Sequence, residues 1–124
     1  MKRTVLVVDD ETAMRRLLYH ALRDRYRVLE ASDFDSAIAA IDTERVDLVL
    51  LDLHLPPRLD LPREGLRICD TIRARSPEIP LVVVSSNDDP AVREALLSTG
   101  VRGFLGKPVD AAALSDLART LLGG

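Results

Sequence analysis

Short runs of aliphatic residues alternate along this chain with longer stretches in which apolar residues recur every three or four positions. The short runs predict strands that are buried on both faces, at residues 4–8, 48–51, 81–84 and 101–105. Residues 26–30 alternate only in part, which is typical of a strand near the edge of a sheet. The chain is therefore expected to build a sheet from these five segments.

The stretches that follow the strands predict five helices, each with an apolar stripe at helical spacing. The stripes are Met14, Leu17, Leu18, Ala21 and Leu22; Phe34, Ala37, Ile38 and Ile41; Leu66, Cys69 and Ile72; Val92, Ala95 and Leu96; and Leu114, Leu117, Ala118 and Leu121. Ser32 or Asp33 can cap the second helix. Asp89, which is followed by Pro90, can cap the fourth helix, and Asp110 can cap the fifth.

A strand followed by a helix, five times over, predicts an α/β fold. Parallel strands need crossover connections, so the sheet should be parallel and carry helices on both faces. The length of 124 residues suits a single domain over residues 1–124. The pattern alone does not fix the order of the strands.

The composition narrows the possible functions. The net charge is −3 and aromatic residues make up 3% of the chain, so direct nucleic-acid binding by this chain is not expected. No apolar segment is long enough for a membrane span, and acidic residues follow the first apolar run too closely for a signal peptide. Cys69 is the only cysteine, which excludes an internal disulfide and agrees with a cytoplasmic setting.

Polar side chains stand where four of the expected strands end. Asp9 and Asp10 follow the first strand and Asp52 ends the third. Ser85 ends the fourth strand and Lys107 follows the fifth. Each residue alone could simply cap a turn. Sites in open α/β sheets lie outside the carboxyl ends of the strands, so the four positions together favour one shared site.

The chemistry of these side chains indicates phosphoryl transfer. Three clustered carboxylates repel one another unless a cation joins them, and Mg²⁺ suits oxygen ligands and keeps several waters. An anionic phosphoryl group could then approach, with Lys107 as a cationic donor and Ser85 as a hydroxyl donor. Asp52 is the expected nucleophile, because a carboxylate can form an aspartyl phosphate.

Four segments that carry these residues resemble the signatures of the response regulator receiver domain, the CheY-like superfamily of two-component signalling. They are Val5–Glu11, Asp47–Pro56, Pro80–Ser86 and Gly103–Pro108, and the resemblance extends over essentially the whole chain. It implies a flavodoxin-like fold whose five parallel strands lie in the order 2-1-3-4-5. It also implies a signalling module rather than an enzyme, one that catalyses its own phosphorylation and slow dephosphorylation.

The resemblance also implies partners and a metal site. A sensor histidine kinase or a histidine phosphotransfer protein would donate phosphate to Asp52, and a downstream effector protein or domain would respond. Asp10, Asp52 and the backbone carbonyl of His54 would bind Mg²⁺ directly. Asp9 would act mostly through water.

Other residues match the switch and tuning positions of the family. Ser85 and Phe104 would follow the phosphoryl group and change the surface around the fourth helix and fifth strand. Lys107-Pro108 matches a peptide bond that is usually cis in the family. His54 and Asn87 lie where the family tunes the lifetime of the phosphorylated form, and we expect them to do so here.

Two features depart from the family pattern. The loop at residues 56–64 is about five residues longer than usual. It is either a tolerated surface insertion or a segment that shapes partner docking and shields the phosphoryl group. Residues 101–103, Val-Arg-Gly, replace the acidic pair of receivers that dimerise through the fourth helix, fifth strand and fifth helix, so that dimer is not expected. The chain is either a stand-alone receiver or part of a longer protein.

Two alternative functions remain. A phosphatase of the haloacid-dehalogenase type also uses a strand-end aspartate and Mg²⁺. Such enzymes typically carry an Asp-x-Asp pair, and His54 stands at the second position here. A pseudo-receiver, an interaction module independent of phosphorylation, would not need the acidic, hydroxyl and lysine residues that this chain retains.

Overall fold

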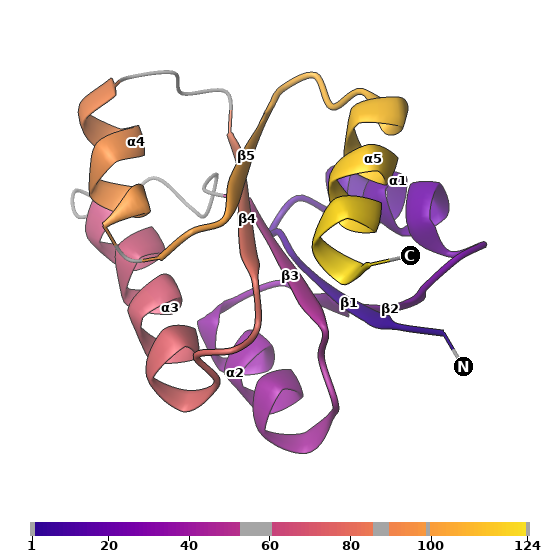
Figure 1. The fold of residues 1–124 in the computed structure, drawn as a ribbon. Helices are drawn as coiled ribbons and strands as arrows, with labels where there is room; N and C mark the ends of the chain where they lie inside the picture. Colours follow the sequence, from indigo (N-terminus) through magenta and orange to yellow (C-terminus); the bar gives the residue numbers. More distant parts are fainter. Residues whose placement is uncertain (1, 53–60, 86–89, 99, 124) are drawn as a thin grey trace.

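The computed structural model describes residues 2–52, 61–85, 90–98 and 100–123. Within these ranges, five strands form one sheet and five helices cover its two faces (Figure 1). The strands are β1 (Thr4–Val8), β2 (Arg27–Ala31), β3 (Leu48–Asp52), β4 (Leu81–Ser85) and β5 (Gly103–Gly106). The helices are α1 (Thr12–Leu22), α2 (Phe34–Thr43), α3 (Leu61–Arg75), α4 (Pro90–Leu97) and α5 (Ala111–Leu122).

The sheet is parallel throughout, with the strand order β2-β1-β3-β4-β5. The expected flavodoxin-like arrangement is therefore confirmed. The chain runs from β1 outward to β2 and then returns to β3 on the other side of β1. Val8, the last residue of β1, pairs with Ala31 of β2 and with Leu51 of β3. A crevice at such a reversal is where open α/β sheets bind ligands.

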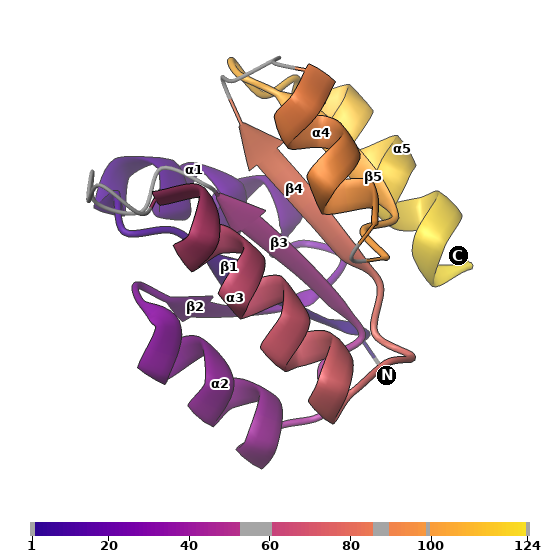
Figure 2. The same ribbon diagram turned by 90° about the vertical axis from the view of Figure 1, so that its left-hand side faces the viewer.

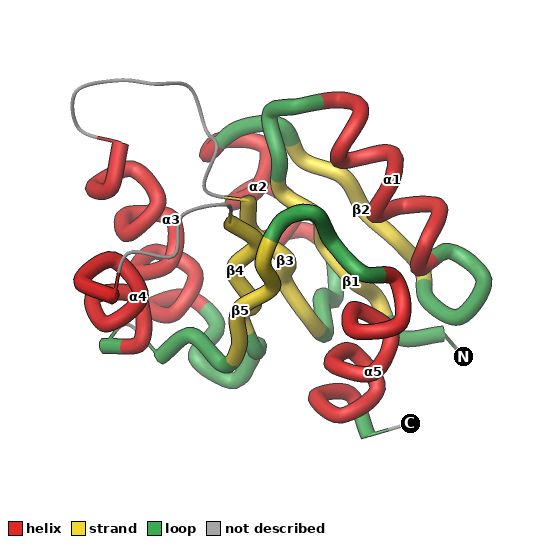
Figure 3. The backbone as a smooth tube through the Cα atoms, turned by 90° about the horizontal axis from the view of Figure 1, so that it is seen from above, coloured by secondary structure: helices red, strands yellow, loops and turns green. Residues whose placement is uncertain are grey.

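The side chains of β1 alternate between two hydrophobic cores. Leu6 and Val8 pack in the core that includes residues of α2 and α3, whereas Val5 and Val7 pack in the core formed with α1 and α5. All four side chains are fully buried. Figure 2 shows α2, α3 and α4 on one face, and Figure 3 shows the strands between the two groups of helices. Burial on both faces explains why this strand is a continuous aliphatic run.

Three predicted helix starts agree with the structure. Asp33 caps α2, because its carboxylate accepts a hydrogen bond from the Ser36 N–H at 2.8 Å. Asp110 caps α5 by accepting from the Ala112 N–H at 2.9 Å. Pro90 is the first residue of α4, and the predicted cap before it, Asp89, lies outside the described residues.

The predicted apolar stripe of α1 is wrong at two positions. Leu17 is 53% exposed and Ala21 is also exposed. Leu18 and Leu22 are buried, and Met14 is half-buried. Helix α1 contacts β1, β2 and α5, and these three residues, four positions apart, supply the narrow face that this contact needs. Periodicity counts apolar residues and does not show how wide the buried face is.

Helix α3 begins earlier than expected, at Leu61. The predicted loop at 56–64 is therefore wrong for residues 61–64, and residues 56–60 lie outside the described ranges. Pro62 is compatible with this start, because the first turn of a helix does not use its N–H groups as intrahelical donors.

Strand β5 begins at Gly103, two residues later than the apolar run predicted. Val101 is nevertheless buried in the core beside α2 and α3, so its apolar character reflects burial and not strand pairing. The Arg102 N–H donates to the Leu81 carbonyl oxygen at 2.8 Å and thereby leads the chain into the sheet.

Candidate functional site

Two buried carboxyl groups and one lysine meet at the carboxyl ends of the central strands. Asp9 directly follows β1 and Asp52 is the last residue of β3, and the two residues are 0% and 2% exposed. Their strands are neighbours, so their ends lie side by side. Lys107, which follows β5, brings its Nζ to 2.5 Å from Asp52 Oδ2. The fold thus gathers three charged residues from distant parts of the sequence.

The backbone of Lys107 is fixed along with its side chain. Its N–H donates to the Ser85 carbonyl oxygen at 3.2 Å, next to the pair formed by Ser85 and Gly106 on β4 and β5. The peptide bond between Lys107 and Pro108 is cis, as expected from the resemblance. The Lys107 side chain is largely buried and that of Asp52 almost completely so. Their attraction is therefore screened less than that of a surface pair.

Burial and the neighbouring Asp52 carboxyl raise the pKa of Asp9 from its ordinary value of 3.8 to about 7. Loss of hydration is the main cause, and contact with Asp52 adds to it. The Glu11 N–H, which donates to Asp9 Oδ1 at 2.9 Å, and the Lys107 ammonium act in the opposite direction. Asp9 Oδ2 is buried and accepts no hydrogen bond from any residue that the structure describes.

These donors fit a magnesium ion. Mg²⁺ is commonly held by one or two carboxylates and keeps several of its waters. Asp9, whose buried Oδ2 accepts no hydrogen bond from the described residues, and the adjacent Asp52 could supply two carboxylates. Within the described ranges, no three acidic, histidine or cysteine side chains are grouped closely enough to hold a metal by themselves. The remaining ligands would therefore be waters, backbone groups or residues beyond those ranges.

Three of the predicted site residues are placed only in part or not at all. Asp10 is half-buried in the bend after β1. His54 and Asn87 lie outside the described residues. Direct metal binding by Asp10 and by the His54 carbonyl stays a prediction, as does the tuning of the phosphorylated state by His54 and Asn87.

Ser85 and Phe104 connect the site to the outer strands. Ser85 is half-buried at the end of β4 and follows Val84, which pairs with Asp52. Phe104 on β5 is half-buried and packs against the core beside α2 and α3. The Arg93 guanidinium of α4 lies over the Phe104 ring, 4.9 Å from its centroid. Phe104 therefore links β5 to α4, the two elements that the predicted switch would affect.

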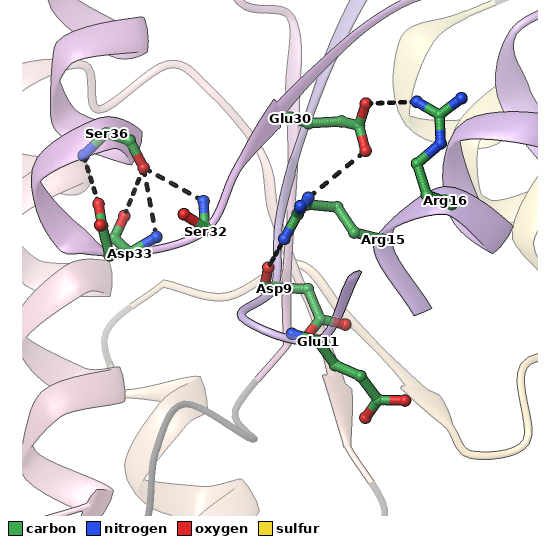
Figure 4. Close-up of polar contacts among 8 residues, drawn as sticks. All are labelled: Asp9, Glu11, Arg15, Arg16, Glu30, Ser32, Asp33 and Ser36. Carbon is green, nitrogen blue, oxygen red and sulfur yellow. Dashed lines mark hydrogen bonds and ion pairs between the residues drawn. The ribbon is translucent and has the colours of Figure 1, made fainter. Parts of the chain in front are cut away.

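Sequence reasoning missed two residues that support this site (Figure 4). Arg15 donates from Nη1 to the Asp9 carbonyl oxygen at 2.8 Å, and its Nε lies 3.4 Å from Glu30 Oε1. Glu30 also pairs with Arg16. An arginine in the first turns of a helix gives no signal by itself. Its partner could be found only from the pairing of β1 with β2, which sets Val7 opposite Glu30.

Comparison with known proteins identifies the family. The family model for the response regulator receiver domain matches residues 5–119. The chain belongs to this family. Receiver domains are signalling modules, so membership supports the non-enzymatic interpretation over the phosphatase alternative.

Curated relatives of this receiver domain are response regulators. It is 35% identical over 119 residues to the response regulator MprA of Mycolicibacterium vanbaalenii. It is 30% identical over 123 residues to the alkaline phosphatase synthesis transcriptional regulatory protein PhoP of Bacillus subtilis. These alignments cover 95% and 98% of this chain but 49% of each relative. The chain therefore spans about half the length of these relatives.

Solved structures share the fold of this receiver domain. A CheY-like receiver domain protein from Methanospirillum hungatei superposes with a TM-score of 0.89 at 23% identity, over 99% of this chain and 95% of that one. NtrX from Brucella abortus gives a TM-score of 0.87 at 34% identity, over 99% of this chain and 27% of that one. In the part of the receiver domain that the structure describes, no helix has the length and apolar character needed to cross a membrane.

Proposed function

We propose that this receiver domain accepts a phosphoryl group on Asp52 from a phosphohistidine of a sensor histidine kinase or histidine phosphotransfer protein. The buried pair of Asp52 and Lys107, with Asp9 beside it, is the observation that carries the proposal. A carboxylate oxygen of Asp52 would attack phosphorus, and the bond from phosphorus to the histidine nitrogen would break. That nitrogen would keep the electron pair and take up a proton from solvent.

The neighbouring residues would position and stabilise the transferring group. Lys107, now in contact with an oxygen of Asp52, would turn its ammonium toward a phosphoryl oxygen. Ser85 would offer its hydroxyl to a second one. Magnesium held by Asp10, Asp52 and the backbone carbonyl of His54, with Asp9 acting mostly through water, would neutralise the carboxylates and so allow an anionic phosphoryl group to approach.

Phosphorylation would act as a switch, because it replaces the single charge of a carboxylate at one buried point by a phosphoryl group that carries about −1.5 to −2 and three strong acceptor oxygens. Ser85 and Phe104 would follow the new group and alter the contact of Phe104 with Arg93 on α4. The surface around α4 and β5 would then bind an effector protein or domain. The curated relatives are about twice as long as this chain, which supports an effector domain in the same polypeptide. We further propose that His54 and Asn87 set the lifetime of the phosphorylated form.

Intact-mass measurement after treatment with acetyl phosphate and Mg²⁺ tests the proposal. The wild-type chain should gain one phosphoryl group, and the gain should disappear in Asp52→Asn or when EDTA removes the metal. Asp24→Asn is a matched control, since the Asp24 side chain is 92% exposed, and it should be phosphorylated like the wild type.

Two results would overturn the proposal. An equal gain in Asp52→Asn would mean that another residue is the acceptor. No gain in the wild type would favour the phosphorylation-independent interaction module instead.

A further inference from the structure

The turn that carries the two adjacent acids is tied to three parts of the fold. The Asp9 N–H donates to the Ala31 carbonyl oxygen of β2 at 3.0 Å. Asp9 Oδ1 accepts from the Glu11 N–H at 2.9 Å, and the Asp9 carbonyl oxygen accepts from Arg15 of α1 at 2.8 Å (Figure 4). Three polar groups of Asp9 are thus held, while the buried Oδ2 accepts no hydrogen bond from the described residues.

The contact with Arg15 acts on both acids at once. The carbonyl that it holds belongs to the peptide unit joining Asp9 to Asp10, and this unit is planar. Holding its oxygen therefore restricts the direction from the Cα of Asp9 to the Cα of Asp10. The side chain of Glu11, at the N-cap of α1, makes no capping hydrogen bond. The hydrogen bond from Arg15 thus provides a link between α1 and the turn that the cap does not.

Arg15 is itself held from the neighbouring strand. Its Nε lies 3.4 Å from Glu30 Oε1 on β2, while Arg16 holds the other oxygen of Glu30 at 2.9 Å. The side chains of Arg15 and Glu30 are largely shielded from solvent. A guanidinium can donate from two nitrogens in fixed directions, so Arg15 can hold the Asp9 carbonyl and Glu30 together. Lysine has one nitrogen and lacks this planar fork.

We infer that Arg15, held by Glu30, is a positioning residue that keeps the Asp9–Asp10 turn in the geometry needed to bind Mg²⁺. The inference rests on the proposed function, because it concerns the same acidic site. If Arg15 acted only through its charge, removing it would raise the Mg²⁺ affinity, since a cation close to the acids opposes binding of a second cation. Removing the charge alone would strengthen Mg²⁺ binding, whereas removing a positioning contact weakens it.

Titration of the 124-residue chain with Mg²⁺ by calorimetry, at constant ionic strength, separates these effects. Arg15→Met should weaken Mg²⁺ binding about tenfold or more, as is typical when a partner that orients a metal ligand is lost. Arg16→Met is the matched control. It removes the same charge and a contact with the same Glu30, but among the described residues Arg16 contacts Glu30 and Tyr19 and not Asp9. Its Mg²⁺ affinity should equal or exceed that of the wild type.

Arg15→Lys provides a second variant that keeps the charge and is expected to fold. It should bind Mg²⁺ more weakly than the wild type and more tightly than Arg15→Met, because one amine can reach the carbonyl without holding Glu30 as well. Hydrogen exchange without metal gives an independent readout. The Glu11 amide, which donates to Asp9, should exchange faster in Arg15→Met and in Arg15→Lys than in the wild type. Its exchange rate in Arg16→Met should equal that of the wild type.

The outcomes separate this inference from the proposed function. The positioning role is overturned if Arg15→Met and Arg15→Lys bind Mg²⁺ as tightly as the wild type, or if Arg15→Met and Arg16→Met lose affinity equally. In either case the proposed function stands, provided that the wild type binds Mg²⁺ and accepts phosphate. A wild-type chain that binds no Mg²⁺ would overturn both.

Discussion

Replacing Asp9 by asparagine should stabilise the metal-free protein, and the gain should grow with pH. Asp9 is 0% exposed, and burial followed by contact with Asp52 raises its pKa from 3.8 to about 7. Above that value the folded protein must carry a buried carboxylate that the unfolded chain exposes to water. Asparagine keeps the shape and an oxygen that can accept from the Glu11 N–H, but it carries no charge.

The size of the effect follows from the pKa. Below pH 3.8 the Asp9 carboxyl is protonated in both the folded and the unfolded chain, and the free energy of unfolding contains no penalty. Between about pH 4 and 7 the folded state binds more protons than the unfolded state, so stability falls as the pH rises. The penalty is complete above pH 7. A shift of about three units at about 1.4 kcal/mol each gives at most about 4 kcal/mol.

Urea unfolding followed by circular dichroism in EDTA, from pH 4 to pH 8.5, measures this difference. The free energies of unfolding of the wild type and Asp9→Asn should agree near pH 4 and diverge by as much as about 4 kcal/mol above pH 7. Asp24→Asn, at a side chain that is 92% exposed, should follow the wild type throughout. A constant difference between the wild type and Asp9→Asn over the whole pH range would refute the assignment of the raised pKa to Asp9.

Three further predictions concern the ion pair, a helix cap and the contact between α4 and β5. Lys107→Met should destabilise the protein by about 3–5 kcal/mol, because it removes the ammonium that contacts the buried Asp52. In a thermodynamic cycle, adding Asp52→Asn to Lys107→Met should restore most of the lost free energy of unfolding. Asp33→Ala should cost about 1 kcal/mol at neutral pH. Hydrogen bonds from Ser36 lower the pKa of Asp33, so the wild-type advantage should vanish on acidification through that lowered pKa. Arg93→Ala should lower the free energy of unfolding in urea by about 0.5–1 kcal/mol, because its guanidinium lies over the Phe104 ring. In a Phe104→Leu background the same substitution should lower it by less.

The strands were predictable because strands that are buried on both faces have nearly continuous aliphatic sequences. Strands β1, β3 and β4 are covered on both faces, so nearly every position is aliphatic and the run itself marks the strand. The convergence of Asp9, Asp52 and Lys107 followed from the rule that parallel strands end at one edge of the sheet. The strand order came from the family resemblance, since periodicity carries no information about which strands are neighbours.

The errors arose where three-dimensional packing decides the outcome. Leu17 has the right residue type and spacing for a core position, but α1 buries a face too narrow to include it. The loop predicted at residues 56–64 includes Pro62, although a proline in the first turn of a helix disturbs no hydrogen bond. The link from Glu30 through Arg15 to Asp9 could not be predicted, because it depends on the alignment of β1 with β2 and on a side chain that turns back toward the start of its own helix.

The position of β1 between β2 and β3 has a consequence for how the polypeptide reaches its native state. The Thr4 N–H donates to Asp47 Oδ2 at 2.8 Å across 43 residues of sequence, and β3 pairs along the side of β1 opposite β2. During synthesis, the backbone N–H and C=O groups on one edge of β1 therefore stay unpaired by β3 until β3 has left the ribosome. Closing such distant pairings is slow, and an uncovered strand edge invites association with other chains. Newly made chains that contain β1 and β2 alone should therefore be prone to associate through the unpaired edge of β1.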